Sequence, residues 1–308
     1  MIRRFLIGLA ISIVCVGSCN DAWCCQSSIA AVVNDQEISL NVVHYFLDRS
    51  LKHLPQAADR VDRNADVVGA GVEHCIDREV ILQHLQSGRF KTSEDELDRR
   101  VEEQKARLEL SGKSFEQFLT DANLSEKEFR RELLWNASWR KYASTFVTVD
   151  HLEKQFELKR KYLDGTTLHV AQILWKSSDA ETMLTARKVH MALISGKIDW
   201  PTAVTAHSES ASATNDGDLG SISYSGPMPR DFTKVAFELE EGEFSEPFVS
   251  PFGIHLIRCV EITPGKKTFE DVAEELRVFE TNRLSQLVAD RHRPKADIKI
   301  EVQTDFSK

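Results

Sequence analysis

The chain has 308 residues, of which 42% are hydrophobic and 28% are charged. This composition is that of an ordinary globular protein and excludes collagen-like, low-complexity and wholly disordered chains. Lys and Arg number 39 against 48 Asp and Glu, so the formal net charge is −9. Nucleic-acid affinity depends on clustered Lys and Arg, so we expect no nucleic-acid partner. The length predicts about two domains, at roughly 150 residues each.

The first segment, residues 1–23, has the pattern of an export signal. Two arginines precede an apolar stretch, Phe5 to Val16, and small residues follow it. The stretch is short for a membrane span, so we expect a secretory signal peptide, with an uncleaved anchor helix as the alternative. Val16 to Cys19 also resembles a bacterial lipoprotein cleavage site, in which Cys19 would carry a lipid. We therefore expect an exported, periplasmic or cell-envelope protein that meets the membrane only through this segment.

The cysteines do not form a disulfide framework. Four of the six lie within the first 25 residues, and Cys75 and Cys259 stand far apart. No C-x-x-C, paired zinc spacing or phosphate-binding loop occurs, so we expect no metal and no cofactor. Cys75 and Cys259 are expected to be buried as small hydrophobic residues.

Residues 24–165 are predicted to form a helical module. Two short strands come first, between Ile29 and Ile38, with a turn at Asn34 and Asp35. Helix starts follow, marked by capping-box spacing, in which a serine and a Glu or Gln three positions on satisfy backbone N–H groups. These caps are at Ser93, Ser114 and Ser125.

After residue 165 the periodicity changes, and strands alternate with helices. We expect a strand from Leu168 to Trp175, followed by a helix whose cap has the spacing of Ser178 and Glu181. Later elements are a short helix begun by Asp199, a helix from Arg230 to Glu238 and a strand from Gly253 to Ile262. A Pro-Gly pair at 264–265 breaks the pattern, so residues 166–263 are predicted to be a separate domain.

Residues 264–308 are predicted to return to the helical module. A long helix is expected from Thr268 to about Asp290, and a strand-like stretch runs from Ile298 to Val302. The apolar face of this helix consists of Val272, Leu276, Phe279 and Leu287. The face has no partner within 166–263, and exposed apolar surface costs about 25 cal/mol per Å², so we expect it to pack on the helical module.

The segment from Leu168 to Glu261 resembles the parvulin (rotamase) family of peptidyl-prolyl cis-trans isomerases. The matching motifs, in chain order, are Val170-Ala171-Gln172-Ile173-Leu174, Ser208-Glu209-Ser210, Gly217-Asp218-Leu219-Gly220, Met228 with Phe232, Gly242-Glu243-Phe244-Ser245-Glu246-Pro247 and Phe252-Gly253-Ile254-His255-Leu256-Ile257. The flanking parts are similar to exported members of the SurA and PrsA type. The resemblance implies an α+β chain: an all-helical chaperone-like module followed by a small α/β domain with a mostly antiparallel four-stranded sheet.

The function implied by the resemblance is proline isomerisation in unfolded, proline-containing polypeptides. An X–Pro amide rotates over a barrier of about 20 kcal/mol. Rotation removes amide resonance without forming a bond to the enzyme, so catalysis needs a dry pocket for the proline ring and polar groups matched to the twisted amide. The resemblance implies that Leu219, Met228 and Phe232 form the proline pocket. It implies that Ser250 and Phe252 also belong to the substrate-binding residues.

The resemblance also assigns polar positions. His255 matches the C-terminal active-site histidine, and Ser210 matches a position near the substrate carbonyl where the family has Cys, Asp or Ser. Ser250 falls near a position that supports a histidine pair by hydrogen bonding. From the residues alone, His255 could equally be a core histidine and Ser210 a solvated loop serine.

Gln172 stands where the family usually has a second histidine. Glutamine both donates and accepts hydrogen bonds, so Gln172 could still orient His255, although it cannot titrate. His169 is expected to face the opposite side of the strand and is a poor substitute. The loop from Lys176 to Ala180 has no arginine cluster, so a preference for phosphorylated substrates is not expected.

Three classes of function are compatible with these patterns. The first is an exported foldase with an active isomerase domain. The second is an ATP-independent chaperone or peptide-binding protein with a degenerate isomerase domain, which Gln172 favours. The third is a hydrolase, suggested by the S-x-x-K spacing of Ser138 and Lys141. No Lys-Thr-Gly accompanies this spacing, and a charged helix surface accounts for it.

Overall fold

The computed structural model describes residues 29–52 and 65–302, so the expected signal segment lies outside the described residues. The chain forms two compact units. Of the described residues, those up to 142 and those from 285 on form the first unit, and residues 143–284 form the second. Within the described ranges, no helix is both long and apolar enough to cross a membrane.

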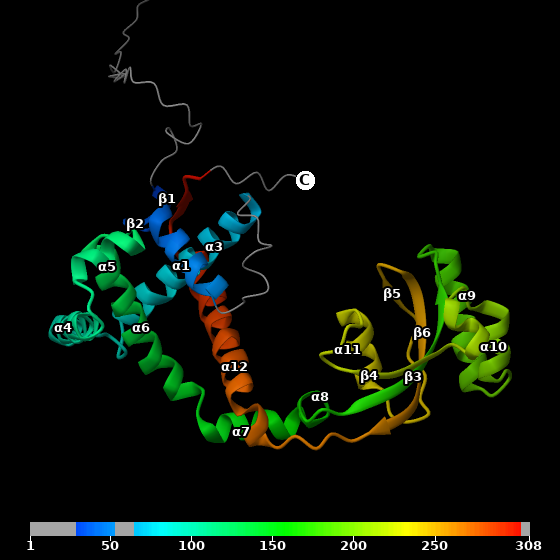
Figure 1. Ribbon diagram of the computed structural model, residues 1–308. Coiled ribbons are helices and arrows are strands. Elements are labelled where there is room, and N and C mark those ends of the chain that lie inside the picture. Colours follow the sequence, from blue (N-terminus) through cyan, green and yellow to red (C-terminus); the bar gives the residue numbers. More distant parts are fainter. Residues whose placement is uncertain (1–28, 53–64, 303–308) are drawn as a thin grey trace, which may run out of the picture. The chain divides into compact units, whose positions relative to one another are not determined.

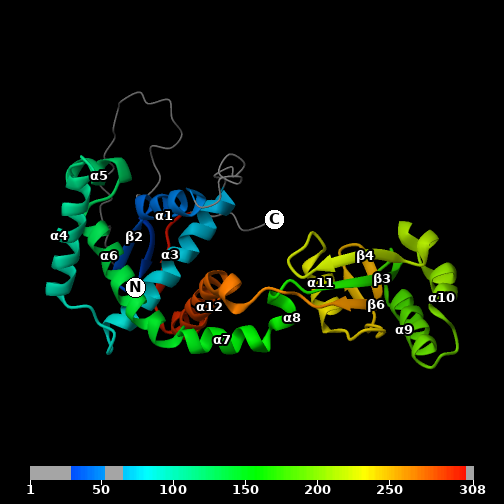
Figure 2. The same ribbon diagram turned by 60° about the horizontal axis from the view of Figure 1, so that its bottom comes forward.

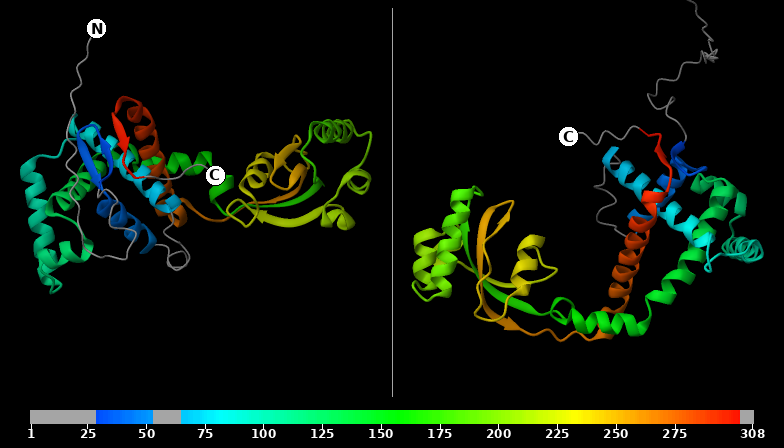
Figure 3. Two further views of the ribbon diagram at one scale, coloured as in Figure 1. Left: turned by 90° about the horizontal axis from the view of Figure 1, so that it is seen from above. Right: turned by 180° about the vertical axis from the view of Figure 1, so that it is seen from behind.

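A small antiparallel sheet in the first unit brings together the two ends of the described chain. Its strands are β1 (Ile29–Val33), β2 (Gln36–Ser39) and β7 (Ile298–Ile300), in the order β2-β1-β7. The turn between β1 and β2 contains Asn34 with a φ of 45°, and β7 lies beside β1 (Figure 3). The predicted strands at both ends are therefore confirmed, and the N-terminal region is mostly rather than wholly helical.

The helices of this region are α1 (Leu40–Lys52), α3 (Ala65–Gln86), α4 (Glu94–Leu110), α5 (Phe115–Ala122) and α6 (Glu126–Phe146). α1 and α3 lie side by side (Figure 2). The three predicted caps all form, because each serine hydroxyl accepts a hydrogen bond from the backbone N–H three positions on: Glu96 for Ser93, Gln117 for Ser114 and Glu128 for Ser125.

The core of the first unit lies between the small sheet and the helices α1 and α3. Val33, Val43 and Ile76 are fully buried there, and Cys75 packs among them. Cys259, in the second unit, is also fully buried, and both thiols are free. The expectation that these two cysteines serve as small core residues is confirmed.

In the second unit, α7 (Val149–Leu158), the short α8 (Arg160–Leu163) and the part of α12 (Phe269–His292) up to Leu284 enclose a separate apolar cluster. The last residues of α12, from Ser285 on, belong to the first unit. Val272 and Leu276 of α12 are buried against Val147, Leu152 and Phe156. The expectation that these two α12 residues pack on the segment preceding residue 165 is confirmed.

The predicted apolar face of α12 is wrong at two positions. Phe279 is 51% exposed and Leu287 is 56% exposed. The buried stripe instead advances four residues at a time, through Val272, Leu276 and Glu280. The carboxylate of Glu280 is bonded by His151, Lys159 and Arg283. A pattern of apolar residues alone could not reveal this stripe, because an acid with cationic partners occupies one of its positions.

The second unit also contains a four-stranded antiparallel sheet. Its strands are β4 (Asp218–Ser223), β3 (Thr167–Trp175), β6 (Gly253–Thr263) and β5 (Phe248–Ser250), in this spatial order. α9 (Ala180–Ile194) and α10 (Trp200–His207) cover one face, and α11 (Arg230–Glu238) covers the other (Figure 1). The α+β fold class is therefore confirmed.

The start of α9 differs from the predicted cap. Asp179, not Ser178, is the capping residue, and its carboxylate accepts a hydrogen bond from the Thr182 N–H. Both residue types cap helices well, but a carboxylate also interacts favourably with the positive end of the helix dipole.

Candidate active site

The four-stranded sheet places Gln172 and His255 on the same face. Side chains alternate between the two faces along a strand. On β3, Val170 packs on the α11 side and Ala171 on the α9 side, so Gln172 points to the α11 side. On β6, Ile257 packs on the α11 side, so His255 points there too.

A chain of hydrogen bonds connects four of the polar side chains on this face. Gln172 Oε1 lies 2.9 Å from His255 Nδ1, and His255 Nε2 lies 2.6 Å from Ser250 Oγ. On the other side, Gln172 Nε2 donates to Ser210 Oγ over 3.2 Å. Ser210 Oγ is also 2.9 Å from Ser212 Oγ. The predicted residues Gln172, Ser210, Ser250 and His255 thus form one continuous network.

The directions of these bonds define the protonation state of the histidine. Because Gln172 donates its Nε2–H to Ser210, its Oε1 faces His255 and can only accept. Nδ1 of His255 therefore carries a proton, and in the neutral imidazole Nε2 accepts from the Ser250 hydroxyl. Ser250 Oγ in turn accepts from the Phe252 N–H. His255 is 5% exposed, and burial lowers its pKa, which also favours the neutral imidazole.

Aromatic rings surround the imidazole. Phe232, which is 1% exposed, meets the ring of His255 edge-on, with centroids 5.6 Å apart. Phe248 stacks on the same imidazole at 5.3 Å and 19°. Leu219 and Met228 belong to the apolar cluster that contains Phe232. The three residues expected to hold a proline ring therefore lie together next to the polar network.

Phe252 is placed differently from the other expected substrate-binding residues. Its side chain is 61% exposed, and its backbone N–H supports Ser250. Sequence reasoning missed Phe248, which is paired with His255 across β5 and β6. Its place two residues before Ser250 could have indicated a shared face, but the stacking depends on a cross-strand register that sequence alone does not supply.

The Gly217-Asp218-Leu219-Gly220 motif holds the loop close to Gln172. Gly217 has a φ of +75°, and a Cβ there would lie 2.2 Å from the Gln172 carbonyl oxygen. Gln172 N–H also donates to the Gly217 carbonyl over 2.9 Å. Only glycine permits this approach, which brings Leu219 toward the network.

His169 does not take part in the network. Its Nε2 lies 2.7 Å from an Asp218 carboxylate oxygen, at a position more than a third exposed. Hydrogen bonds from the Gly220 N–H and from His169 hold the pKa of Asp218 below its usual value. His169 therefore has a partner of its own and, as expected, does not replace the missing second histidine.

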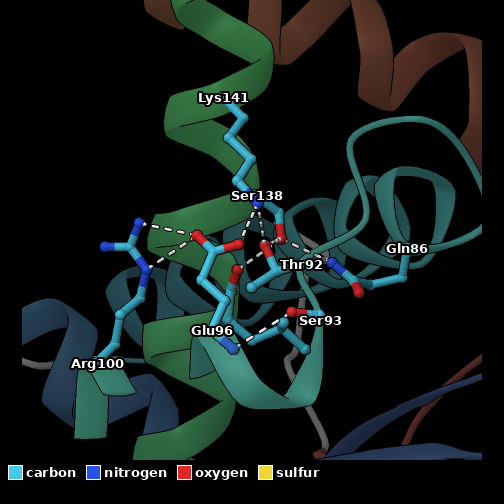
Figure 4. A network of polar contacts seen from close by, with 8 residues as sticks. Gln86, Thr92, Ser93, Glu96, Arg100, Ser138 and Lys141 are labelled. Carbon is cyan, nitrogen blue, oxygen red and sulfur yellow. Dashed lines mark hydrogen bonds and ion pairs between the residues drawn. The ribbon is translucent and has the colours of Figure 1, made fainter. Parts of the chain in front are cut away.

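The Ser138–Lys141 spacing has a structural role in the first unit (Figure 4). Ser138 is fully buried rather than on a helix surface, and its hydroxyl contacts Thr92 Oγ1 and the Leu134 carbonyl. Lys141 forms an ion pair with Glu96. A serine hydroxyl that is fully buried and bonded within the protein cannot reach a substrate, so the structure contradicts the hydrolase interpretation.

The first unit contains a pocket of about 300 Å³, which we call the α3–α6 pocket. Its apolar and aromatic lining includes Val42, Tyr45, Leu82, Leu124 and Trp135. Two ion pairs that connect α3 with α6 contribute to its wall, Arg78 with Glu132 and Arg131 with Glu79. The guanidinium of Arg78 lies 4.8 Å from the ring centre of Trp135. Most of the charge in this pocket is thus already paired.

Two different family models match the two parts of the chain. Residues 173–261 match the model of the PPIC-type PPIASE domain, and residues 1–143 match the SurA-like N-terminal domain. The four-stranded fold is therefore that of a PpiC-type peptidyl-prolyl isomerase domain. With the SurA-like domain ahead of it, the chain has the domain composition of a PrsA- or SurA-type protein.

Individual relatives carry both names. Foldase protein PrsA 4 of Bacillus cereus is 25% identical over 231 residues, covering 72% of this chain and 75% of the relative. Chaperone SurA of Xanthomonas oryzae pv. oryzae is 24% identical over 235 residues, covering 68% of this chain and 50% of the relative. A crystal structure of peptidylprolyl isomerase (PrsA) from Bacillus cereus is 22% identical, with a TM-score of 0.40 over 90% of this chain and 96% of that one.

Proposed function

We propose that the chain is a peptidyl-prolyl cis-trans isomerase that acts as a foldase on exported, unfolded polypeptides containing proline. The observation that carries this proposal is the neutral His255 network beside an apolar wall of Phe232, Met228 and Leu219. The isomerase domain comprises residues 166–263, between the helical module at 24–165 and the C-terminal segment at 264–308. Residues 1–23 direct export.

The proposed mechanism requires no proton transfer. The proline ring of the substrate packs against the apolar wall, where water is excluded. The carbonyl of the residue before proline lies toward Ser210. Ser210 Oγ accepts hydrogen bonds from Gln172 and from the Ser212 N–H, so its own proton is left to donate. On substrate binding this proton turns from Ser212 Oγ to the substrate carbonyl. As the amide twists, loss of resonance makes its nitrogen more basic, and a low-polarity pocket favours this less charge-separated state. His255 does not act on the substrate directly. It holds the side-chain amide of Gln172 in the orientation that donates to Ser210.

The α3–α6 pocket is proposed to hold an apolar side chain of the client. An exposed aromatic or aliphatic side chain contributes about 1.5–3 kcal/mol when it is buried. The paired charges of the wall leave few polar groups to be desolvated without a partner. Such an anchor would retain an unfolded chain while its X–Pro bonds isomerise.

A second candidate is a chaperone that binds clients without isomerising them, and Gln172 in place of the usual histidine favours it. A turnover assay on proline peptides with the full mature chain distinguishes the two functions. We expect the wild type to accelerate exchange and His255→Ala to abolish the acceleration. His190→Ala is the matched control, because His190 is also buried in this unit but lies 3.7 Å from Glu246, outside the network. Intact suppression of aggregation without any turnover would leave the binding-only function.

A further inference from the structure

Two histidines from distant parts of the chain stack on each other in the first unit. His84 is in the last turn of α3, and His292 ends α12. Their ring centres are 3.7 Å apart, and the rings are 25° from parallel. Together with Lys295 of the 3-10 turn η2 (Arg293–Lys295), they line a pocket of about 210 Å³. We call it the histidine pocket.

The polar groups of this pocket fall into two sets. Asn34, Gln83 and Ser87 already have hydrogen-bond partners in the protein. By contrast, no hydrogen bond or ion pair among the described residues involves the ring nitrogens of His84 and His292 or the ammonium of Lys295. Three groups that can donate hydrogen bonds therefore line one cavity, and none of them has an acceptor among the described residues.

The surroundings of the histidine pocket are cationic. None of its described lining residues is acidic. Burial is the main cause that lowers the pKa values of His84 and His292, and Arg291 and Lys295 lower both further. Most acids on the neighbouring elements have partners outside the pocket. Glu73 and Asp77 bond Arg293, and Glu79 bonds Arg131. Asp290 accepts from Gln286, Asp297 lies 3.7 Å from Lys299, and Asp35 is exposed in the turn after β1.

We propose that His84, His292 and Lys295 form a binding site for a tetrahedral oxyanion of the phosphate or sulfate type. Imidazolium and ammonium groups donate to such oxygens in charge-assisted hydrogen bonds. A cationic lysine in the lining makes a metal ion a poor occupant. The anion offsets the repulsion between two protonated rings, so binding takes up protons and strengthens as the pH falls. It also fastens the C-terminal turn η2 to α3.

The test is titration of the full mature chain with sodium sulfate, whose charge is constant near neutral pH, against sodium chloride at equal ionic strength. We expect sulfate to shift the ring proton resonances of His84 and His292 in NMR spectra and to raise the pKa of both. Affinity should increase up to about tenfold per pH unit between about pH 7.5 and about pH 5.5, for each proton taken up. Lys295→Gln should weaken binding at least about fivefold, whereas Lys299→Gln, with a side chain that is 67% exposed, should not.

A phosphate group could be free or part of a lipid headgroup, and a second arm separates these sources. Vesicles of phosphatidylglycerol are compared with vesicles of phosphatidylcholine in a sedimentation assay. Sulfate binding without sedimentation identifies a free oxyanion as the ligand, and sedimentation that depends on Lys295 identifies a headgroup. Identical histidine shifts in sulfate and chloride, or equal effects of Lys295→Gln and Lys299→Gln, would overturn the proposal.

Discussion

Replacing Gln172 by histidine tests whether the active site needs a titrating pair or only a hydrogen-bonded one. Gln172 accepts from His255 over 2.9 Å and donates to Ser210 over 3.2 Å. A neutral imidazole at this position also has one donor and one acceptor nitrogen, so it can retain at least one of these contacts. One hydrogen bond contributes about 1 kcal/mol, so Gln172→His should change kcat/KM by less than about tenfold, or 1.4 kcal/mol.

The assay is exchange of X–Pro peptides by wild type and Gln172→His, with several residues before proline. Circular dichroism and thermal melting confirm that the variant folds, because Gln172 is only 8% exposed and the larger ring must fit. A silent wild type together with a variant that gains activity by more than about a hundredfold would refute the reasoning. Such a result would mean that the pair of histidines itself is required and that the wild-type domain only binds.

Three further predictions follow from the geometry. Because burial lowers the pKa of His255 below its usual value of 6.5, the stability due to its neutral form should be constant above about pH 6.5 and fall below it, since the unfolded chain takes up the proton first. Activity should persist to lower pH, because the folded site loses its neutral imidazole only at the lowered pKa. Urea melts at each pH and a pH–rate profile measure the two. Gly217→Ala should lower the free energy of unfolding by at least about 2 kcal/mol in urea melts, because the added Cβ collides with the Gln172 carbonyl oxygen. Gly196→Ala is the control: its φ is similar and no atom lies within 4 Å, so it should lose only about 1 kcal/mol to backbone strain. Leu276→Ala should cost about 2–5 kcal/mol and Phe279→Ala less than about 1 kcal/mol, and equal losses would contradict the observed burial of α12.

Local signals in the sequence predicted most of the elements because they are encoded by near neighbours. Caps such as Ser93 and Ser114, and the helix from Arg230 to Glu238, need only residues a few positions apart. The short strands β4 and β5 were not predicted individually. Each has six or fewer residues, and pairing with a long neighbour, not its own pattern, determines its position.

The candidate site was predicted through motifs, and the parts missed are those that depend on tertiary pairing. Gln172 and His255 are 83 positions apart, and only the register of β3 with β6 brings their side chains within hydrogen-bond distance. Phe248 and the buried Glu280 escaped prediction for the same reason. An aromatic ring stacked on a histidine and a carboxylate among cationic partners are recognisable only when the partner elements are known.

The composition of the network bears on which function the domain performs. Buried polar groups contribute little net stability, because each hydrogen bond replaces bonds to water, and apolar side chains of similar shape can be as stable. The fold already has an apolar core on both faces of its sheet, so it does not need polar side chains at Gln172, Ser250 and His255 to form. Every one of these groups has a partner, and the chain of bonds runs through Ser210 to Ser212. A polar network that is costly for folding and lies against apolar residues is what an amide-twisting site requires, and a surface that only captures extended chains does not require it.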